Sequence, residues 1–258
     1  MITVVKIGGR ILDDEAALRA FCRDFTRLGG QKLLVHGGNV LAGRLQEALG
    51  IPVRRVEGRR VTDEQTLQAV TMVYAGWYNK QLVALLQAAG CNAIGLSGCD
   101  ASCITSLRRP PVKLSDGSEL DFGFVGDVKP SSIDMRLVLS FLQQGLVPVF
   151  SAINHDGRGQ LLNTNADTVA SAVAAALGAR LIYCFEKPGV LADQSDDSSA
   201  LAELDPPGFA ALKASGAISE GMLPKLETAF ASLAMGAAEV IVKDAASLLK
   251  GGGTKIRL

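Results

Sequence analysis

The sequence contains few of the residues from which metal sites and acid–base triads are built. Its 258 residues include two histidines and five cysteines, and no two cysteines are spaced as Cys-x-x-Cys. A zinc site, a disulfide framework and a serine-hydrolase triad are therefore all disfavoured, the last also because no Gly-x-Ser-x-Gly occurs. We expect no metal ion that is held by protein side chains alone.

An excess of charge and membrane-spanning runs are also missing. Lysine plus arginine and aspartate plus glutamate both number 26, so net charge gives no reason to expect nucleic acid or an anionic membrane as a partner. The first apolar run follows no basic segment, and the uncharged stretch 137–154 is interrupted by Gly145 and Pro148. Together with the lack of a disulfide pattern, this predicts a cytoplasmic protein.

Two common nucleotide-binding motifs are absent. The sequence has no Gly-Lys dipeptide, which the Walker A loop requires, and no Gly-x-Gly-x-x-Gly. A P-loop NTPase and a typical Rossmann dehydrogenase are therefore both disfavoured. Any phosphate site in this chain must be built in another way.

What the sequence does contain is an alternation of apolar strands with helices. The runs KLLVH, AIGL, LVPVF, RLIYCF and EVIVK, together with the N-terminal run, are typical of buried strands. Among the expected helices, one opens with a capping box of Thr62 and Gln65, and another covers about 131–144. This order predicts an α/β fold, a three-layer αβα sandwich whose mostly parallel sheet continues across two lobes, 1–177 and 178–258.

Three of the expected strands run directly into glycine: VVKIGG, LLVHGG and AIGLSG. Glycine lets a ligand approach the main chain, and the helix that follows offers unpaired N–H groups to phosphate. For a single glycine pair, a tight strand-to-helix turn is the simpler explanation. Ligands of open α/β sheets, however, bind beyond the carboxyl ends of the strands. Recurrence at three strand ends therefore indicates a ligand site, and Lys6 is an unexpected charge in the first of these strands.

The segment LLNTNADTVA holds the most concentrated polar cluster. Asn163, Asn165 and Asp167 alternate, so in an extended chain they share one face, and Asp167 can lie in the first turn of the next helix. Helix capping by Asn165 alone is the simpler alternative. A further amide and a carboxylate exceed what a cap requires, which favours a binding site.

Several basic residues stand in unusual places. Lys225 follows Pro224 early in an expected helix, where a cation opposes the helix dipole. Taken alone it is a candidate surface residue, but with Lys6 it could supply a second cation to a phosphate site. Of the adjacent Arg59 and Arg60, one could hold a carboxylate through two parallel hydrogen bonds while the other is solvated.

Taken together, these motifs resemble the amino acid kinase family and, within it, the acetylglutamate kinases. The resemblance spans nearly the whole chain, and its motifs in order are KIGG, LVHGG, GRRVTD, GFVGDV, LLNTNAD, GVL and GMLPKL. Single motifs are weak, whereas their order and spacing are specific. The segments GRRVTDEQTLQAVTMVYAG and YCFEKPGVL are similar to a bacterial branch in which the acyl group is acetyl or succinyl.

The resemblance implies an enzyme that transfers the γ-phosphate of ATP, bound with Mg²⁺, to the γ-carboxylate of an N-acyl-L-glutamate in arginine biosynthesis. A carboxylate with a reference pKa of about 4.3 is ionised at neutral pH, so the reaction needs no general base. It needs cations and N–H donors where an anion meets a polyanion. The implied lobes are 1–177 for the acyl amino acid and 178–258 for the nucleotide.

By this resemblance, Lys6 and Lys225 stabilise the transferring phosphoryl group and Asp167 holds the two lysines in position. The implied substrate-binding residues are Gly37, Gly38, Arg60, Asn163 and Asn165, with Arg60 on the α-carboxylate and the asparagines on polar parts of the acylamino acid. The implied nucleotide-binding residues are Gly8, Gly9, Glu186, Lys187, Pro188, Gly189, Val190, Leu191, Ala217, Ile218 and Ser219.

Two departures from the family pattern bear on substrate and assembly. Asn39 stands where the family usually has a third glycine, and its side chain is expected to project toward the acyl pocket. The chain begins at its first strand, without the N-terminal helix that arginine-inhibited hexamers of the family have, so we expect a homodimer without strong arginine feedback. Two other functions stay open: a different acceptor (aspartate, carbamate, glutamate or a nucleotide), and a nucleotide-binding module without catalysis.

Overall fold

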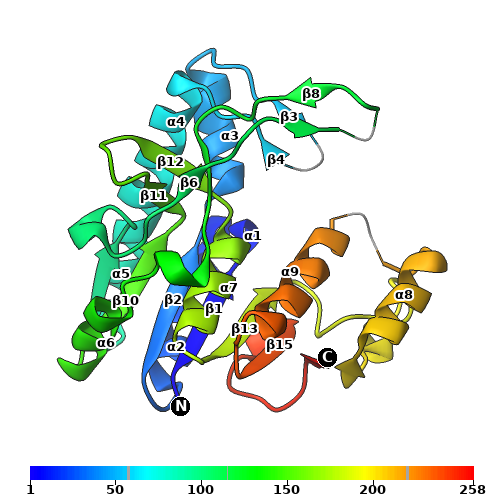
Figure 1. Cartoon of the computed structure of the whole chain (residues 1–258). Helices are drawn as coiled ribbons and strands as arrows, with labels where there is room; N and C mark the ends of the chain where they lie inside the picture. The colour runs from blue at the N-terminus through cyan, green and yellow to red at the C-terminus, as the bar shows by residue number, and fades with distance from the viewer. Residues whose placement is uncertain (57–58, 115, 219–220) are drawn as a thin grey trace.

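A computed structural model describes residues 1–56, 59–114, 116–218 and 221–258. An eight-stranded sheet runs through the molecule in the order β14-β16-β15-β13-β1-β2-β10-β5 (Figure 1). The neighbours from β15 to β5 are parallel, whereas β15 and β16 are antiparallel. The strands of this sheet are β1 (Thr3–Ile7), β2 (Lys32–His36), β5 (Ala93–Leu96), β10 (Val147–Ser151), β13 (Arg180–Phe185), β14 (Glu203–Leu204), β15 (Glu239–Asp244) and β16 (Thr254–Ile256).

Smaller sheets lie beyond one end of the large sheet (Figure 1). One has four strands in the order β11-β12-β9-β6, and the hairpins β3-β4 and β7-β8 make two more. Because β12 pairs with both β11 and β9, the LLNT segment lies inside its sheet and leads directly into the next helix. The strands are β3 (Arg55–Val56), β4 (Arg59–Arg60), β6 (Leu107–Arg108), β7 (Val112–Lys113), β8 (Glu119–Leu120), β9 (Val125–Asp127), β11 (Ile153–His155) and β12 (Leu161–Thr164).

Helices cover both faces of the large sheet because successive strand side chains point to opposite faces. One face packs mainly against α6, α7 and α9, and the other against α1 to α5. The predicted three-layer α/β fold is confirmed, and no helix in the described ranges has the length and apolar character that a membrane crossing requires. The helices are α1 (Gly9–Asp13), α2 (Glu15–Arg27), α3 (Asn39–Ala48), α4 (Glu64–Thr71), α5 (Asn79–Ala88), α6 (Met135–Gln143), α7 (Ala166–Ala176), α8 (Pro206–Ala214) and α9 (Leu223–Ala234).

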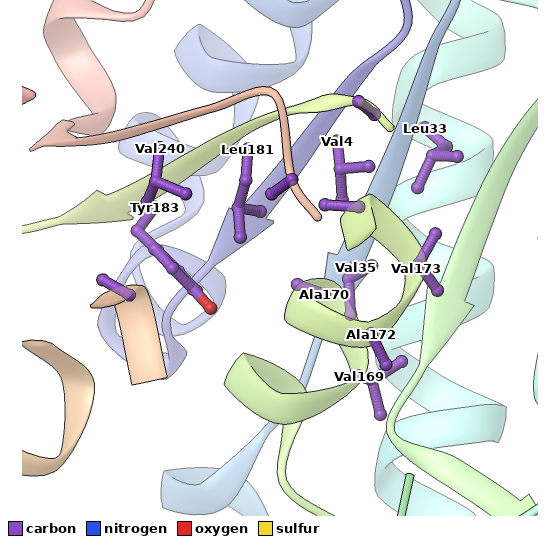
Figure 2. Close-up of a cluster of buried hydrophobic side chains, with 14 of the residues drawn as sticks. Val4, Leu33, Val35, Val169, Ala170, Ala172, Val173, Leu181, Tyr183 and Val240 are labelled. Atoms are coloured by element: carbon purple, nitrogen blue, oxygen red, sulfur yellow. The ribbon is translucent and has the colours of Figure 1, made fainter. Parts of the chain in front are cut away.

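The helix α7 lies close against the middle of the sheet. Figure 2 shows Ala170 and Val173 of α7 among Val4, Leu33 and Leu181 of the strands, all of them completely buried. Small alanine side chains let the helix axis approach the strands, and the dense apolar packing holds its first turn in place. That first turn carries Asp167, so this packing determines where the carboxylate stands.

Two details of the predicted helices are wrong. The N-cap of α4 is Asp63, whose side chain accepts from the Thr66 N–H at 2.8 Å, whereas Thr62 is buried and donates to the Arg60 carbonyl. The helix expected from about residue 131 begins only at Met135. The residues before it form a separate 3₁₀ turn that starts at Pro130, because proline's fixed φ and missing N–H suit a first turn.

Candidate active site

A cavity of about 130 Å³, hereafter the first cavity, opens where β1 and β2 end. These strands are parallel and in register, with Ile7 beside His36, so the glycine turns that follow them lie side by side. The α7 helix packs on β1 and begins at the same edge. The predicted residues that line the first cavity are Lys6, Gly8, Gly9, Gly37, Gly38, Arg60, Asn163, Asn165 and Asp167.

The third glycine-ended strand does not contribute to the first cavity. Gly98, which follows β5, is absent from its lining, and β5 is separated from β1 by β2 and β10. A Cβ atom on Gly98 would lie 2.6 Å from the Ile104 carbonyl oxygen and closer still to the Asn154 side chain. Glycine at this position therefore permits tight packing, and two of the three glycine-ended strands, β1 and β2, contribute their glycines to the first cavity.

Lys6 and Lys225, from opposite ends of the chain, approach the same aromatic ring. The Lys6 Nζ lies 5.6 Å from the centre of the Phe185 ring, and the Lys225 Nζ lies 4.3 Å from it. Lys6 also forms an ion pair with Asp167, with 2.6 Å between Nζ and Oδ1 and both side chains largely buried. Asp167 lies in the first turn of α7, where the helix dipole favours an anion.

The electrostatic balance at this point leaves positive charge available. Burial lowers the pKa of Lys225, and the nearby Lys6 lowers it further, whereas Asp167 and Glu186 act in the opposite direction. Among the described residues, no carboxylate forms an ion pair with Lys225. Asp167 thus contacts Lys6 directly and acts on Lys225 only through space. A multiply charged anion between the two ammonium groups would be strongly stabilised.

Arg60 presents a buried cation to the first cavity. Its side chain is fixed by two hydrogen bonds, from Nη2 to the Asn39 carbonyl at 3.0 Å and from Nη1 to Gln46 Oε1. Burial lowers the pKa of Arg60, its Nε has no hydrogen-bond partner, and no described carboxylate pairs with it. A buried guanidinium without a counter-ion at a cavity wall indicates an anionic ligand. Arg59, by contrast, is exposed at the edge of the same cavity.

The two predicted asparagines are held in different ways. Asn165 caps α7, because its Oδ1 accepts from the Asp167 N–H at 2.7 Å and from the Thr168 N–H at 3.4 Å. Asn163 is buried on β12, and its Nδ2 donates to Thr62 Oγ1 at 3.0 Å, which orients the amide. Capping therefore explains the hydrogen bonds of the Asn165 side-chain oxygen, but Asn163 and Asn165 both also line the first cavity.

A second cavity of about 100 Å³ lies between the two predicted nucleotide-binding segments. Lys187, Gly189, Val190 and Leu191 line it from one segment, and Ala217 and Ile218 line it from the other. Gln194, which follows the first segment and also lines this cavity, donates from Nε2 to the Ala217 carbonyl of the second segment at 3.0 Å. Glu186 and Pro188 are not part of this lining, and Ser219 lies outside the described residues.

Among the residues of the first cavity that sequence reasoning missed, Tyr74 and Arg109 carry long polar side chains. The Tyr74 hydroxyl donates to Asn39 Oδ1 at 2.7 Å, and the Arg109 Nε donates to Asp127 Oδ2 at 3.0 Å. Tyr74 belongs to a π-helical segment, Met72–Tyr78, that interrupts the long helix between α4 and α5. Tyr74 lies within the segment GRRVTDEQTLQAVTMVYAG, but no periodicity signals the π-helical turn to which it belongs, and Arg109 stands in no motif.

The same π-helical segment explains why residue 38 is glycine. A Cβ atom at this position would lie 2.6 Å from Tyr78 Cδ2 and 2.9 Å from Tyr74 Cδ1. The two rings occupy the space that any larger side chain would need. The close contact with these two aromatic rings therefore fixes the position of the second glycine turn beside the first cavity.

His36 supports this turn from inside the sheet. It is completely buried, with Nδ1 2.9 Å from the Gly37 carbonyl and Nε2 3.1 Å from the Asn79 side-chain nitrogen. Because an amide nitrogen only donates and a carbonyl only accepts, the neutral ring carries its proton on Nδ1. Burial is the main cause that lowers the pKa of His36 to about 4.

We predict that the free energy of unfolding falls as the pH is lowered from 6.5 toward 4. In this window the unfolded chain binds a proton on His36 that the folded chain does not, so lower pH favours unfolding. The expected loss is about 2 kcal/mol between pH 7 and pH 5. Urea unfolding at both pH values measures it. The pH difference should shrink by this amount in His36→Gln, and an unchanged difference would contradict the assignment.

Comparisons with known proteins agree with this geometry. The sequence profile of the amino acid kinase family matches residues 1–244. The acetylglutamate kinase of Phocaeicola vulgatus is 45% identical over 99% of this chain and 98% of its own length. That of Cytophaga hutchinsonii is 45% identical over 96% of this chain and 92% of its own. A crystal structure from Streptococcus mutans superposes with a TM-score of 0.77 at 27% identity, covering 99% of this chain and 98% of that one.

Proposed function

We propose that this chain, which belongs to the amino acid kinase family, transfers the γ-phosphoryl group of ATP to the γ-carboxylate of N-acetyl-L-glutamate, a step of arginine biosynthesis. The observation that carries the proposal is the meeting of Lys6, Lys225 and Asp167 beside one cavity. Kinship with acetylglutamate kinases along nearly the whole chain supports the choice of acceptor.

This reaction requires the protein to position the reactants and to supply positive charge, and it requires no proton transfer. The acceptor carboxylate is ionised at neutral pH and attacks the γ-phosphorus directly, so ADP leaves and an acyl phosphate forms. Negative charge is shared by the attacking, transferring and leaving oxygens. Lys6 and Lys225 are proposed to stabilise these oxygens, while Asp167 keeps Lys6 in position through their ion pair. Main-chain N–H groups of Gly8, Gly9, Gly37 and Gly38 are proposed to add donors.

The remaining residues of the first cavity are proposed to hold the acyl amino acid. Arg60, fixed by Gln46 and Asn39, would bind the α-carboxylate through its unused donors. Asn163 and Asn165 would contact polar parts of the acylamino group. Asn39, whose side chain accepts from Tyr74, also lines this cavity and is the position at which acetyl and succinyl groups would be told apart.

The two cavities support the assignment of the two substrates to different parts of the chain. All residues that line the first cavity fall within 1–177, and all that line the second fall within 178–258. We therefore propose that 1–177 binds the acyl amino acid and 178–258 binds the nucleotide, with Lys225 reaching from the second part to the first. The pairing of β1 with β13 makes one sheet of both parts.

The nucleotide is proposed to be ATP with Mg²⁺, which the phosphates and water hold for the most part. Segments 187–191 and 217–219 would bind its base and ribose at the second cavity, whose lining does not include Glu186. Within the described ranges, no group of three or more His, Cys, Asp or Glu residues is placed to hold a metal ion. We further propose a cytoplasmic homodimer, which light scattering after gel filtration would test.

The test of the function is a coupled assay of ADP release. N-acetyl-L-glutamate and N-succinyl-L-glutamate are compared, with L-glutamate, L-aspartate and carbamate as control acceptors. We expect turnover with N-acetyl-L-glutamate. Turnover with only N-succinyl-L-glutamate would keep the reaction and change the acyl group, whereas a folded protein inactive with both would refute the proposal.

The depressed pKa of Lys225 predicts an early alkaline limit of activity. Phosphoryl transfer needs the ammonium form, and burial beside Lys6 favours its loss, so kcat/KM for MgATP should decline at a pH below 10.5, the ordinary value for lysine. A bound triphosphate restores the charge, so kcat should decline at a higher pH. In Lys225→Arg, which stays protonated, the limit should move upward. Coincident profiles of the two proteins would exclude Lys225 as the titrating group.

A further inference from the structure

An ion pair joins two residues that are chain neighbours of the two cavity linings. Arg10 follows Gly9, which lines the first cavity, and its Nη1 pairs with Glu186 Oε2. Glu186 precedes Lys187, which lines the second cavity. Residues 176 positions apart in the sequence, each next in the chain to a residue that lines one of the cavities, are thus joined.

This ion pair contributes little to the stability of the fold. The Arg10 side chain is 78% exposed and that of Glu186 is 49% exposed, and water screens an attraction of this kind. Because the pair is weak in water, a stronger anion can replace Glu186 at Arg10 without a large cost.

The pair also belongs to the electrostatic environment of the two lysines. Both Arg10 and Glu186 shift the pKa of Lys225, Arg10 downward and Glu186 upward, together with Lys6 and Asp167. Three cations and two carboxylates therefore act on one region. Asp167 is buried in its ion pair with Lys6, whereas Glu186 is the exposed partner and the one that can move away.

We infer that Arg10 is a third cation for the polyphosphate of the nucleotide, and that Glu186 is its displaceable counter-ion in the absence of ligand. The inference rests on the proposed function only in taking a nucleotide as the ligand. The guanidinium presents two parallel N–H groups that match two phosphate oxygens, which the carboxylate of Glu186 otherwise accepts. Arg10 follows the Gly8-Gly9 turn directly, and like Lys6 it acts on the charge of Lys225.

Two single variants distinguish phosphate binding by Arg10 from a purely structural role, in which the ion pair only holds the two segments together. If Arg10 binds phosphate, Arg10→Ala weakens nucleotide binding, and Glu186→Gln strengthens it because the competing carboxylate has lost its charge. If the pair merely holds the two segments together, both variants weaken binding to the same degree. Arg19→Ala serves as the matched control, because Arg19 forms a comparable exposed pair with Glu15 on α2, away from both cavities.

Isothermal titration of the full chain with Mg²⁺-ATP analogue, MgADP and AMP, without any acceptor, measures the effect. For Arg10→Ala we expect the Kd of the triphosphate analogue to rise about tenfold and that of AMP to change little, since removing one charge-assisted contact has roughly this effect. For Glu186→Gln we expect a severalfold lower Kd, and for Arg19→Ala no change.

An Arg10→Ala Kd equal to that of the unaltered chain, or equal weakening by Arg10→Ala and Glu186→Gln, overturns the inference. Because no acceptor is present, a failure of the acylglutamate assay leaves this experiment intact. If the unaltered chain binds no nucleotide at all, both the inference and the proposed function fail. Normal binding with an unaffected Arg10→Ala variant refutes only the inference.

Discussion

Replacement of Lys225 by methionine is expected to lower kcat by about 10²–10³-fold while the KM for MgATP changes only a few-fold. The Lys225 ammonium stands over the Phe185 ring beside the Lys6–Asp167 pair, where it would face oxygens that gain charge during transfer. A contact that strengthens only in the transition state affects turnover more than ground-state binding. A loss of this size corresponds to about 3 kcal/mol of barrier.

Lys225→Met is a cleaner probe than Lys6→Met. Methionine keeps a flexible apolar side chain against Phe185, and no described carboxylate loses an ion-pair partner. Lys6→Met, in contrast, would leave Asp167 as a buried charge without its counter-ion and would destabilise the fold. The matched control is Lys213→Met, because the Lys213 Nζ also lies over a ring, that of Phe209, and Lys213 lines neither cavity.

The same experiment decides between catalysis and simple nucleotide binding. A non-catalytic module would use Lys225 only to hold phosphate, so the loss of ATP affinity in the variant would be as large as any loss of turnover. Steady-state kinetics together with the Kd for MgATP distinguish the outcomes. Equal losses of turnover and affinity would contradict the catalytic role proposed for Lys225.

Replacement of Arg60 by alanine is expected to raise the KM for the acyl amino acid by about 10²-fold and to leave the KM for MgATP nearly unchanged. Arg60 is the buried guanidinium that has unused donors at the wall of the first cavity. Removing one member of a desolvated ion pair costs about 2–5 kcal/mol, of which part is the unpaired carboxylate of the ligand. Arg60→Lys should recover little, because a single ammonium cannot replace two parallel hydrogen bonds.

Two further variants test the position of the Arg60 side chain. Arg55→Ala removes an exposed arginine from the strand paired with Arg60 and should leave both KM values close to those of the unaltered chain. Gln46→Leu removes the acceptor of Arg60 Nη1, so it should raise the KM for the acyl amino acid without changing that for MgATP. If Arg60→Ala raised both KM values equally, the α-carboxylate assignment would be wrong. Unfolding curves of each variant report any loss of stability.

Local sequence patterns predicted most of the fold. Buried strands such as RLIYCF appear as continuous apolar runs because both faces of a parallel sheet are covered, and β13 spans that run. The start of α4 was misplaced by one residue because Thr62 and Asp63 are both good caps. Tertiary contacts decided between them, since Thr62 is buried against Asn163 and Arg60.

Several predicted site residues that are far apart in the sequence lie close together in the structure, and their order along the chain does not reveal this. Lys6 was noted as an unexpected charge in a buried strand, and Asp167 as part of a polar cluster larger than a helix cap requires. In the structure the two form an ion pair. Gly98, which follows the third glycine-ended strand, does not line the first cavity, and a glycine that permits packing looks identical in sequence to one that admits a ligand. Arg109 stands in no motif, and Tyr74 lies in a quoted segment without being singled out there, so both were missed.

By itself the sequence determined the class of fold, the absence of common metal and nucleotide motifs, and the short segments that carry unusual polar residues. These properties depend on the burial and backbone preferences of neighbouring residues, which periodicity records. Only the tertiary structure decided that Lys6 and Lys225 share the Phe185 ring, that Arg60 rather than Arg59 is buried, and that Arg10 meets Glu186. Such distances depend on strand order, register and helix packing, which are set by the whole chain at once.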